Sequence, residues 1–123
     1  MTAPSPSHRL PDHGLRLWYS QVSGIVWWTV HINALAALTP LVCANPSAIW
    51  AMHAVTLATA AATALALWWS WELVRSAGGT LDSIGAPAGR RRFLGLFGLA
   101  ISGISLLLIL WEGAYVGLLD PCA

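Results

Sequence analysis

The sequence predicts an all-α integral membrane protein, a bundle of three transmembrane helices. Of its 123 residues, 57% are hydrophobic and only 9% are charged, whereas a soluble domain carries about 25% charged residues. The apolar residues form three segments, at about 17–42, 47–74 and 93–119. Each is long enough to cross roughly 30 Å of hydrocarbon as a helix. This composition argues against a soluble enzyme, a nucleic-acid-binding domain and a disordered tail.

The first predicted helix follows a polar segment. Residues 1–16 contain three prolines and no apolar run, and we interpret them as a cytoplasmic tail ahead of a transmembrane domain formed by residues 17–123. The apolar segment that follows is too long for the apolar core of a cleaved signal peptide. Pro40 lies near its end and is expected to kink or terminate the helix.

The connections between the predicted helices differ in length. Asn45 and Pro46 suit the N-cap and the first position of the second helix, so the first two helices should form an antiparallel hairpin. The second and third helices are joined by a longer stretch rich in Gly, Ser and Pro, which indicates a loop. The third helix should stop at Asp120 and Pro121.

The arginines predict the orientation of the chain in the membrane. All six precede the first helix or lie between the second and the third: Arg9, Arg16, Arg75, Arg90, Arg91 and Arg92. Positive charge is enriched on the cytoplasmic side of membrane proteins. We therefore expect a multi-pass protein of the bacterial plasma membrane with its N-terminus inside and its C-terminus outside.

The two cysteines lie at helix ends that this topology places together. Cys43 follows the first helix and Cys122 follows the third. Both would face the outer, oxidising compartment, where disulfides persist. We predict a disulfide between them, which requires their Cα atoms to come within about 7 Å; the alternative is a pair of free thiols.

Small residues recur at helical spacing along the third predicted helix. Such residues allow close approach between helices in lipid, where apolar burial provides no driving force. The stripe could pack against the other two helices, or it could form a docking face for another membrane subunit. Its members are Gly95, Gly98, Ser102 and Ser105, with Gly113 and Gly117 forming a G-x-x-x-G motif.

Two histidines and one glutamate lie well inside the predicted spans. His53 and Glu112 should lie at nearly equal depth near the outer side, so we predict a hydrogen bond between them. A carboxylate at this depth is also a candidate for proton transfer. His31 should lie roughly 7 Å deeper than His53, which does not suit two ligands of one haem iron. We expect no metal, no cofactor and no catalytic residue.

Several short motifs follow one another in a characteristic order: His31 and then Cys43, WAMHAVT from Trp50, RRRFL at 90–94 and LDPC at 119–122. This order resembles small three-helix membrane proteins of unassigned function encoded beside bacterial haem-copper (caa-type) cytochrome oxidase genes. The resemblance covers about residues 17–122. It implies a respiratory-chain setting and assigns no catalytic residue.

The sequence thus favours a non-enzymatic accessory subunit or assembly factor, with the lipid bilayer and a larger membrane complex as its partners. One alternative is a haem- or copper-handling protein that uses His31, His53 and the cysteines. Another is a small transporter or channel subunit. The transporter interpretation is weakened because no predicted span is interrupted by Gly or Pro at mid-depth. The helices that form the binding sites of carriers usually have such an interruption.

Overall fold

The computed structural model describes residues 12–77 and 87–123, which form three long helices. Helix α1 spans Asp12–Ala44, α2 spans Ile49–Ser76 and α3 spans Pro87–Leu118. A short 3₁₀ helix, η1 (Pro46–Ala48), connects α1 to α2. All three long helices are long and apolar enough to span a membrane. The predicted fold class is confirmed.

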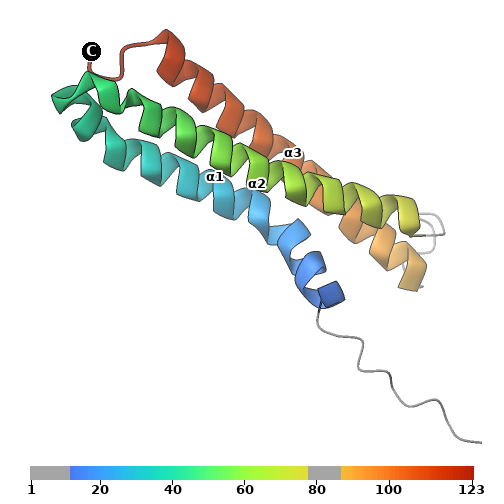
Figure 1. Ribbon diagram of the computed structural model, residues 1–123. Helices are drawn as coiled ribbons and strands as arrows, with labels where there is room; N and C mark the ends of the chain where they lie inside the picture. Colours follow the sequence, from blue (N-terminus) through green and yellow to red (C-terminus); the bar gives the residue numbers. More distant parts are fainter. Residues whose placement is uncertain (1–11, 78–86) are drawn as a thin grey trace, which may run out of the picture.

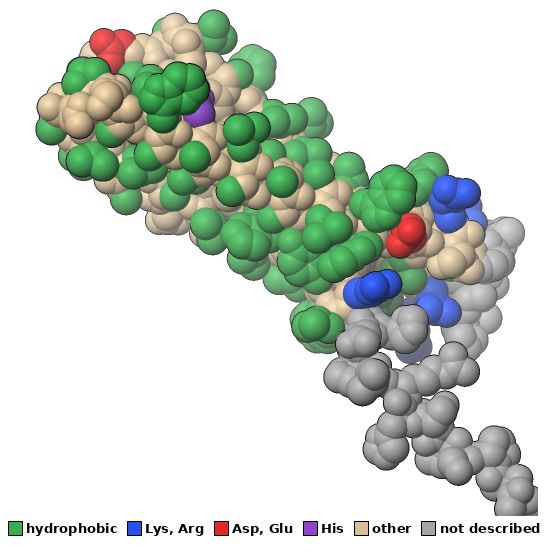
Figure 2. All heavy atoms as spheres, viewed as in Figure 1, with side chains coloured by type: hydrophobic (Ala, Val, Ile, Leu, Met, Phe, Trp, Pro, Cys, Tyr) green, Lys and Arg blue, Asp and Glu red, His purple; other side chains and the backbone are tan. Residues whose placement is uncertain are grey.

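The helices run side by side in an up-down-up arrangement (Figure 1). The α1–α2 turn and the C-terminus lie at one end, and the start of α1, the end of α2 and the start of α3 lie at the other. In Figure 2, arginine side chains gather at the second end and hydrophobic side chains cover much of the visible length between the two ends. We call these the turn end and the arginine end.

The predicted hairpin between the first two helices is present. At the turn end, the side chain of Asn45 accepts hydrogen bonds from the backbone N–H and the hydroxyl of Ser47, at 3.3 and 2.7 Å. Pro46 occupies the first turn of η1, where its missing N–H costs no hydrogen bond. These two residues fix the tight reversal of the chain.

Two of the helices begin earlier than predicted. Helix α1 begins at Asp12, so the last five residues of the predicted 1–16 tail are helical. Helix α3 begins at Pro87, six residues before the predicted 93, because proline is well suited to an initial helical position. Residues 1–11 of the predicted tail and residues 78–86 of the predicted loop lie outside the described residues.

Pro40 does not terminate α1. The helix continues to Ala44, and the backbone N–H of Asn45 still donates to the carbonyl of Leu41 at 2.8 Å. Proline removes only one hydrogen bond of the helical ladder. Helices that cross a membrane tolerate this because neighbouring groups compensate for the loss.

The interior of the bundle is narrow and largely polar or small. Few large apolar side chains are fully buried, the main ones being Met52 and Ile109. Most large hydrophobic side chains point outward, as expected for helices surrounded by lipid tails. Buried hydroxyl-bearing residues line the helix contacts: Ser20, Ser23, Thr59, Thr63, Ser70, Ser102 and Ser105. Several of these hydroxyls donate to carbonyls of their own helix, so the main contribution of these small side chains is to let the helices pack closely.

Candidate functional site

A polar cluster joins all three helices within the membrane-spanning region. His31 of α1 is wholly buried. Its Nδ1 lies 3.0 Å from Oε2 of Glu112 in α3, and its Nε2 lies 3.1 Å from Oγ1 of Thr56 in α2. One imidazole ring thus bridges the other two helices.

Trp28 completes this arrangement. Its indole N–H donates to Oε1 of Glu112 at 3.2 Å, so both carboxylate oxygens and both ring nitrogens of His31 have partners. Glu112 is partly exposed, with 29% of its side-chain surface accessible, and Trp28 and Thr56 are also only partly buried. We call His31, Thr56, Glu112 and Trp28 the His31–Glu112 cluster.

The hydrogen-bond pattern constrains the positions of the protons. The hydroxyl of Thr56 lies 3.0 Å from the carbonyl of Met52 and donates its single proton there. Thr56 must then accept from Nε2–H of His31. Nδ1 and Oε2 share one further proton, which gives either an imidazolium–carboxylate pair or a neutral imidazole with a carboxylic acid. Every polar atom of the cluster is satisfied in both forms.

The predicted hydrogen bond between His53 and Glu112 is wrong. Glu112 bonds to His31 instead, and His53 packs against Trp50 with ring centroids 6.1 Å apart. His53 lies level with Gly117, where an added Cβ would be 3.8 Å from its Cε1. That position is more than one helical turn beyond Glu112, so the equal depths expected from residue counting do not hold.

Gly113 sets the register that builds the cluster. A Cβ at this position would collide with Cγ2 of Thr56 and lie 3.1 Å from its Oγ1. The missing side chain lets α2 approach α3 at Thr56, one turn deeper than His53. Thr56 is thereby placed against His31.

The sequence prediction missed Thr56 and Trp28 as partners. Thr56 lies three residues after His53 on the same helical face, and Trp28 lies three residues before His31. Their proximity along the helices was therefore visible. The rotation of each helix about its axis and its offset along the bundle decide which side chains come into contact. These could not be predicted from the sequence.

The two histidines do not converge. His31 has both ring nitrogens engaged in hydrogen bonds, and His53 lies at a different level. Over residues 12–77 and 87–123, the structure brings no three His, Cys, Asp or Glu side chains together in a way that could hold a metal ion. The geometry therefore lends no support to a haem or copper site built on these residues.

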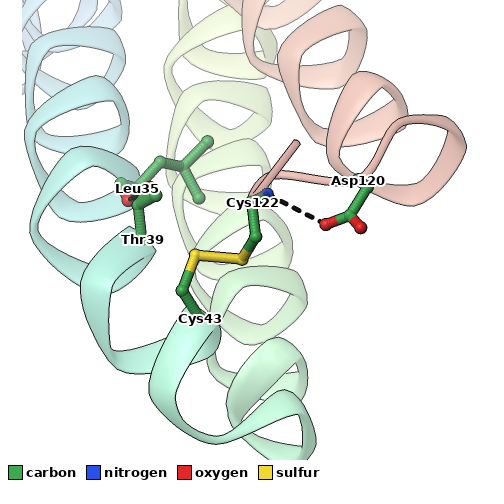
Figure 3. Close-up of a disulfide and its surroundings, with 5 residues drawn as sticks. All are labelled: Leu35, Thr39, Cys43, Asp120 and Cys122. Atoms are coloured by element: carbon green, nitrogen blue, oxygen red, sulfur yellow. Dashed lines mark hydrogen bonds between the residues drawn. A yellow bond between two sulfur atoms is a disulfide. The ribbon is translucent and has the colours of Figure 1, made fainter.

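The predicted disulfide between Cys43 and Cys122 is present at the turn end. Their Cα atoms are 5.6 Å apart and the sulfurs are bonded at 2.04 Å. Figure 3 shows Cys122 lying against the end of α1 after the chain leaves α3, and its backbone N–H donates to the Asp120 carboxylate at 2.9 Å. The bond joins residues separated by 79 positions and ties α1 to α3.

The small residues of α3 mostly face the other two helices. Gly95, Gly98, Ser102, Ser105 and Gly113 are buried, whereas Gly117 is exposed. A Cβ on Gly98 would lie 2.5 Å from Oγ of Ser70 and 2.9 Å from the carbonyl oxygen of Ser20. This geometry supports the packing interpretation. A docking role for the five buried positions is inconsistent with their burial.

A second set of interhelical hydrogen bonds lies toward the arginine end. The Tyr19 hydroxyl donates to the carbonyl of Ala62 at 2.9 Å and accepts from the indole of Trp27 at 3.0 Å. The Gln21 amide donates to the carbonyl of Leu94 at 2.7 Å. Together with the His31–Glu112 cluster and the disulfide, these contacts connect the helices at three levels.

Comparison with known proteins adds no assignment. Protein-family models, curated proteins and solved structures were all searched, and none matches this chain.

Proposed function

We propose that the protein is a non-catalytic accessory subunit or assembly factor of a larger respiratory membrane complex, of the haem-copper oxidase type. The observation that carries this proposal is that the polar groups of the His31–Glu112 cluster are paired with one another across the three helices. The cluster satisfies its own polar atoms, and the disulfide ties α1 to α3. A small, internally locked unit with an apolar outer surface is suited to docking against other membrane helices.

The need to hold three helices in one arrangement also explains the polar side chains between them. In lipid, an interhelical hydrogen bond contributes about 0.6 kcal/mol on average, so several are needed to fix one arrangement of three helices. The His31–Glu112 cluster and the Tyr19, Gln21 and Ser70 contacts supply them. The resemblance to proteins encoded beside oxidase genes supplies the kind of complex, and the bacterial plasma membrane with the N-terminus inside is part of this proposal.

Affinity purification tests the proposal directly. The tagged chain is extracted from its native membrane in a mild detergent and its companions are identified by mass spectrometry, beside an equally tagged, unrelated three-helix protein. We expect haem-copper oxidase subunits in constant ratio with this chain alone. Recovery without companions, or with a complex of another class, would overturn the proposal.

A second function, proton transfer for the partner complex, is favoured by one observation. Glu112 lines a groove of about 430 Å³ between α1 and α3, with Ile32, Leu35, Trp111 and Tyr115 among its other walls. The proton shared by Nδ1 and Oε2 thus lies beside an opening toward the surroundings. If Glu112→Gln abolishes the activity of the complex while leaving its assembly intact, proton transfer replaces the structural role.

A further inference from the structure

We propose that the arginine end holds a binding site for the phosphodiester headgroup of an anionic glycerophospholipid. A cavity of about 450 Å³ lies between the start of α1, the end of α2 and the start of α3. Each helix contributes a charged side chain to its walls: Arg16, Glu72 and Arg91. Basic pockets between transmembrane helices near the membrane surface are suited to binding lipid headgroups.

The charges of the cavity complement a phosphodiester. Two guanidinium groups and one carboxylate give a net charge of +1, which matches the single negative charge of the headgroup phosphate. Among the described residues, neither Arg16 nor Arg91 forms an ion pair with a carboxylate. Both guanidinium groups are therefore available to donate to phosphate oxygens, for which their planar geometry is well suited.

Arg16 is held in position by aromatic residues. Its guanidinium carbon lies 5.5 Å from the ring centroid of Trp69, within the range of a cation–π interaction. Trp69 in turn meets Tyr19 edge to face at 5.2 Å, and the Tyr19 hydroxyl is anchored to α2. The cation is thus oriented before any ligand arrives, which lowers the cost of binding.

The remaining walls favour a lipid over a free phosphate. Leu17 and Leu73 line the cavity beside the polar groups, so a ligand with apolar and anionic parts fits it. Both residues border the apolar segments of α1 and α2, where the acyl chains of a lipid lie. Glu72 can accept a hydrogen bond from a headgroup hydroxyl, which phosphatidylglycerol offers and phosphatidylcholine lacks.

The site is tested by native mass spectrometry of the full chain released from nanodiscs that contain equal amounts of phosphatidylglycerol and phosphatidylcholine. We expect the wild type to retain phosphatidylglycerol selectively. The double variant Arg16→Gln/Arg91→Gln should bind it roughly tenfold more weakly. The matched control is Arg75→Gln/Arg90→Gln, which removes the same charge at the same end from residues that do not line the cavity.

The site is supported if the Arg75→Gln/Arg90→Gln control still retains phosphatidylglycerol and the Arg16→Gln/Arg91→Gln variant loses it. Equal loss in both would show that diffuse surface charge attracts the lipid and would overturn the proposal. Thermal unfolding is then measured with inorganic phosphate and with short-chain phosphatidylglycerol, to distinguish a free anion from a lipid headgroup. If both raise the unfolding temperature equally, the cavity binds free phosphate and the lipid proposal is overturned. Circular dichroism and the intact disulfide establish that each variant is folded.

Discussion

Replacing Glu112 by leucine removes two interhelical contacts at once. The carboxylate accepts from Trp28 at 3.2 Å and is bonded to His31 at 3.0 Å. Interhelical hydrogen bonds in membranes contribute about 0.6 kcal/mol on average and up to about 1.7 kcal/mol. A wholly buried Nδ1 without a partner adds a cost of about 1 kcal/mol. We therefore expect Glu112→Leu to lower the free energy of unfolding by about 2–3 kcal/mol.

The matched control is Glu112→Gln. Its amide oxygen can accept from Trp28 while its NH₂ donates to Nδ1 of His31, and Nε2–H continues to donate to Thr56. Every polar atom remains paired, so this variant should stay within about 0.5 kcal/mol of the wild type.

The assay is a titration with sodium dodecyl sulfate in mixed micelles, followed by far-ultraviolet circular dichroism. His31→Leu and the double variant with Glu112→Leu complete a thermodynamic cycle, in which we expect a coupling of about 1 kcal/mol. An unchanged midpoint for Glu112→Leu would refute the stabilising role of the cluster. Equal destabilisation by leucine and glutamine would instead show that the carboxyl group itself is required.

Three further outcomes follow from the packing, the disulfide and the topology. Gly98→Ala should lower the free energy of unfolding by about 1–3 kcal/mol, because its Cβ would meet Ser70 Oγ at 2.5 Å; Gly103→Ala, whose Cβ meets only a leucine methyl at 3.9 Å, should be neutral in the same titration. Cys122→Ser should destabilise the chain by less than the roughly 4–5 kcal/mol that loop entropy predicts for a 79-residue separation, and in unreduced membranes only this variant should react with a maleimide. Alkaline phosphatase fused after Ala123 should be active and a fusion within 78–89 silent; the reverse pattern would contradict the proposed orientation.

The sequence was sufficient for the features that depend on hydropathy and on which end a residue occupies. Three long apolar segments required three spanning helices. The disulfide required only that Cys43 and Cys122 leave their helices at the same end, which the number of spans decides. Neither prediction depended on how the helices are rotated about their axes.

The hydrogen-bond partner of Glu112 could not be predicted from hydropathy and helix ends. Counting residues from the turn placed His53 at its level, but the contact between Gly113 and Thr56 fixes α2 against α3 with a different offset. That offset arises from side chains distant in sequence, and an error of one turn changes every partner inside the bundle. His31, which was expected to lie roughly 7 Å deeper than His53, is the residue that Glu112 contacts.

The covalent link at the turn end has a consequence for biogenesis. Cys43 reaches its side of the membrane once the first helix has crossed, whereas Cys122 follows α3 and arrives there only after that helix has crossed as well. A molecule whose third helix has failed to insert keeps its two thiols on opposite sides of the bilayer. Oxidation therefore marks fully inserted molecules chemically, and the ratio of oxidised to reduced chains in a membrane measures the efficiency of insertion.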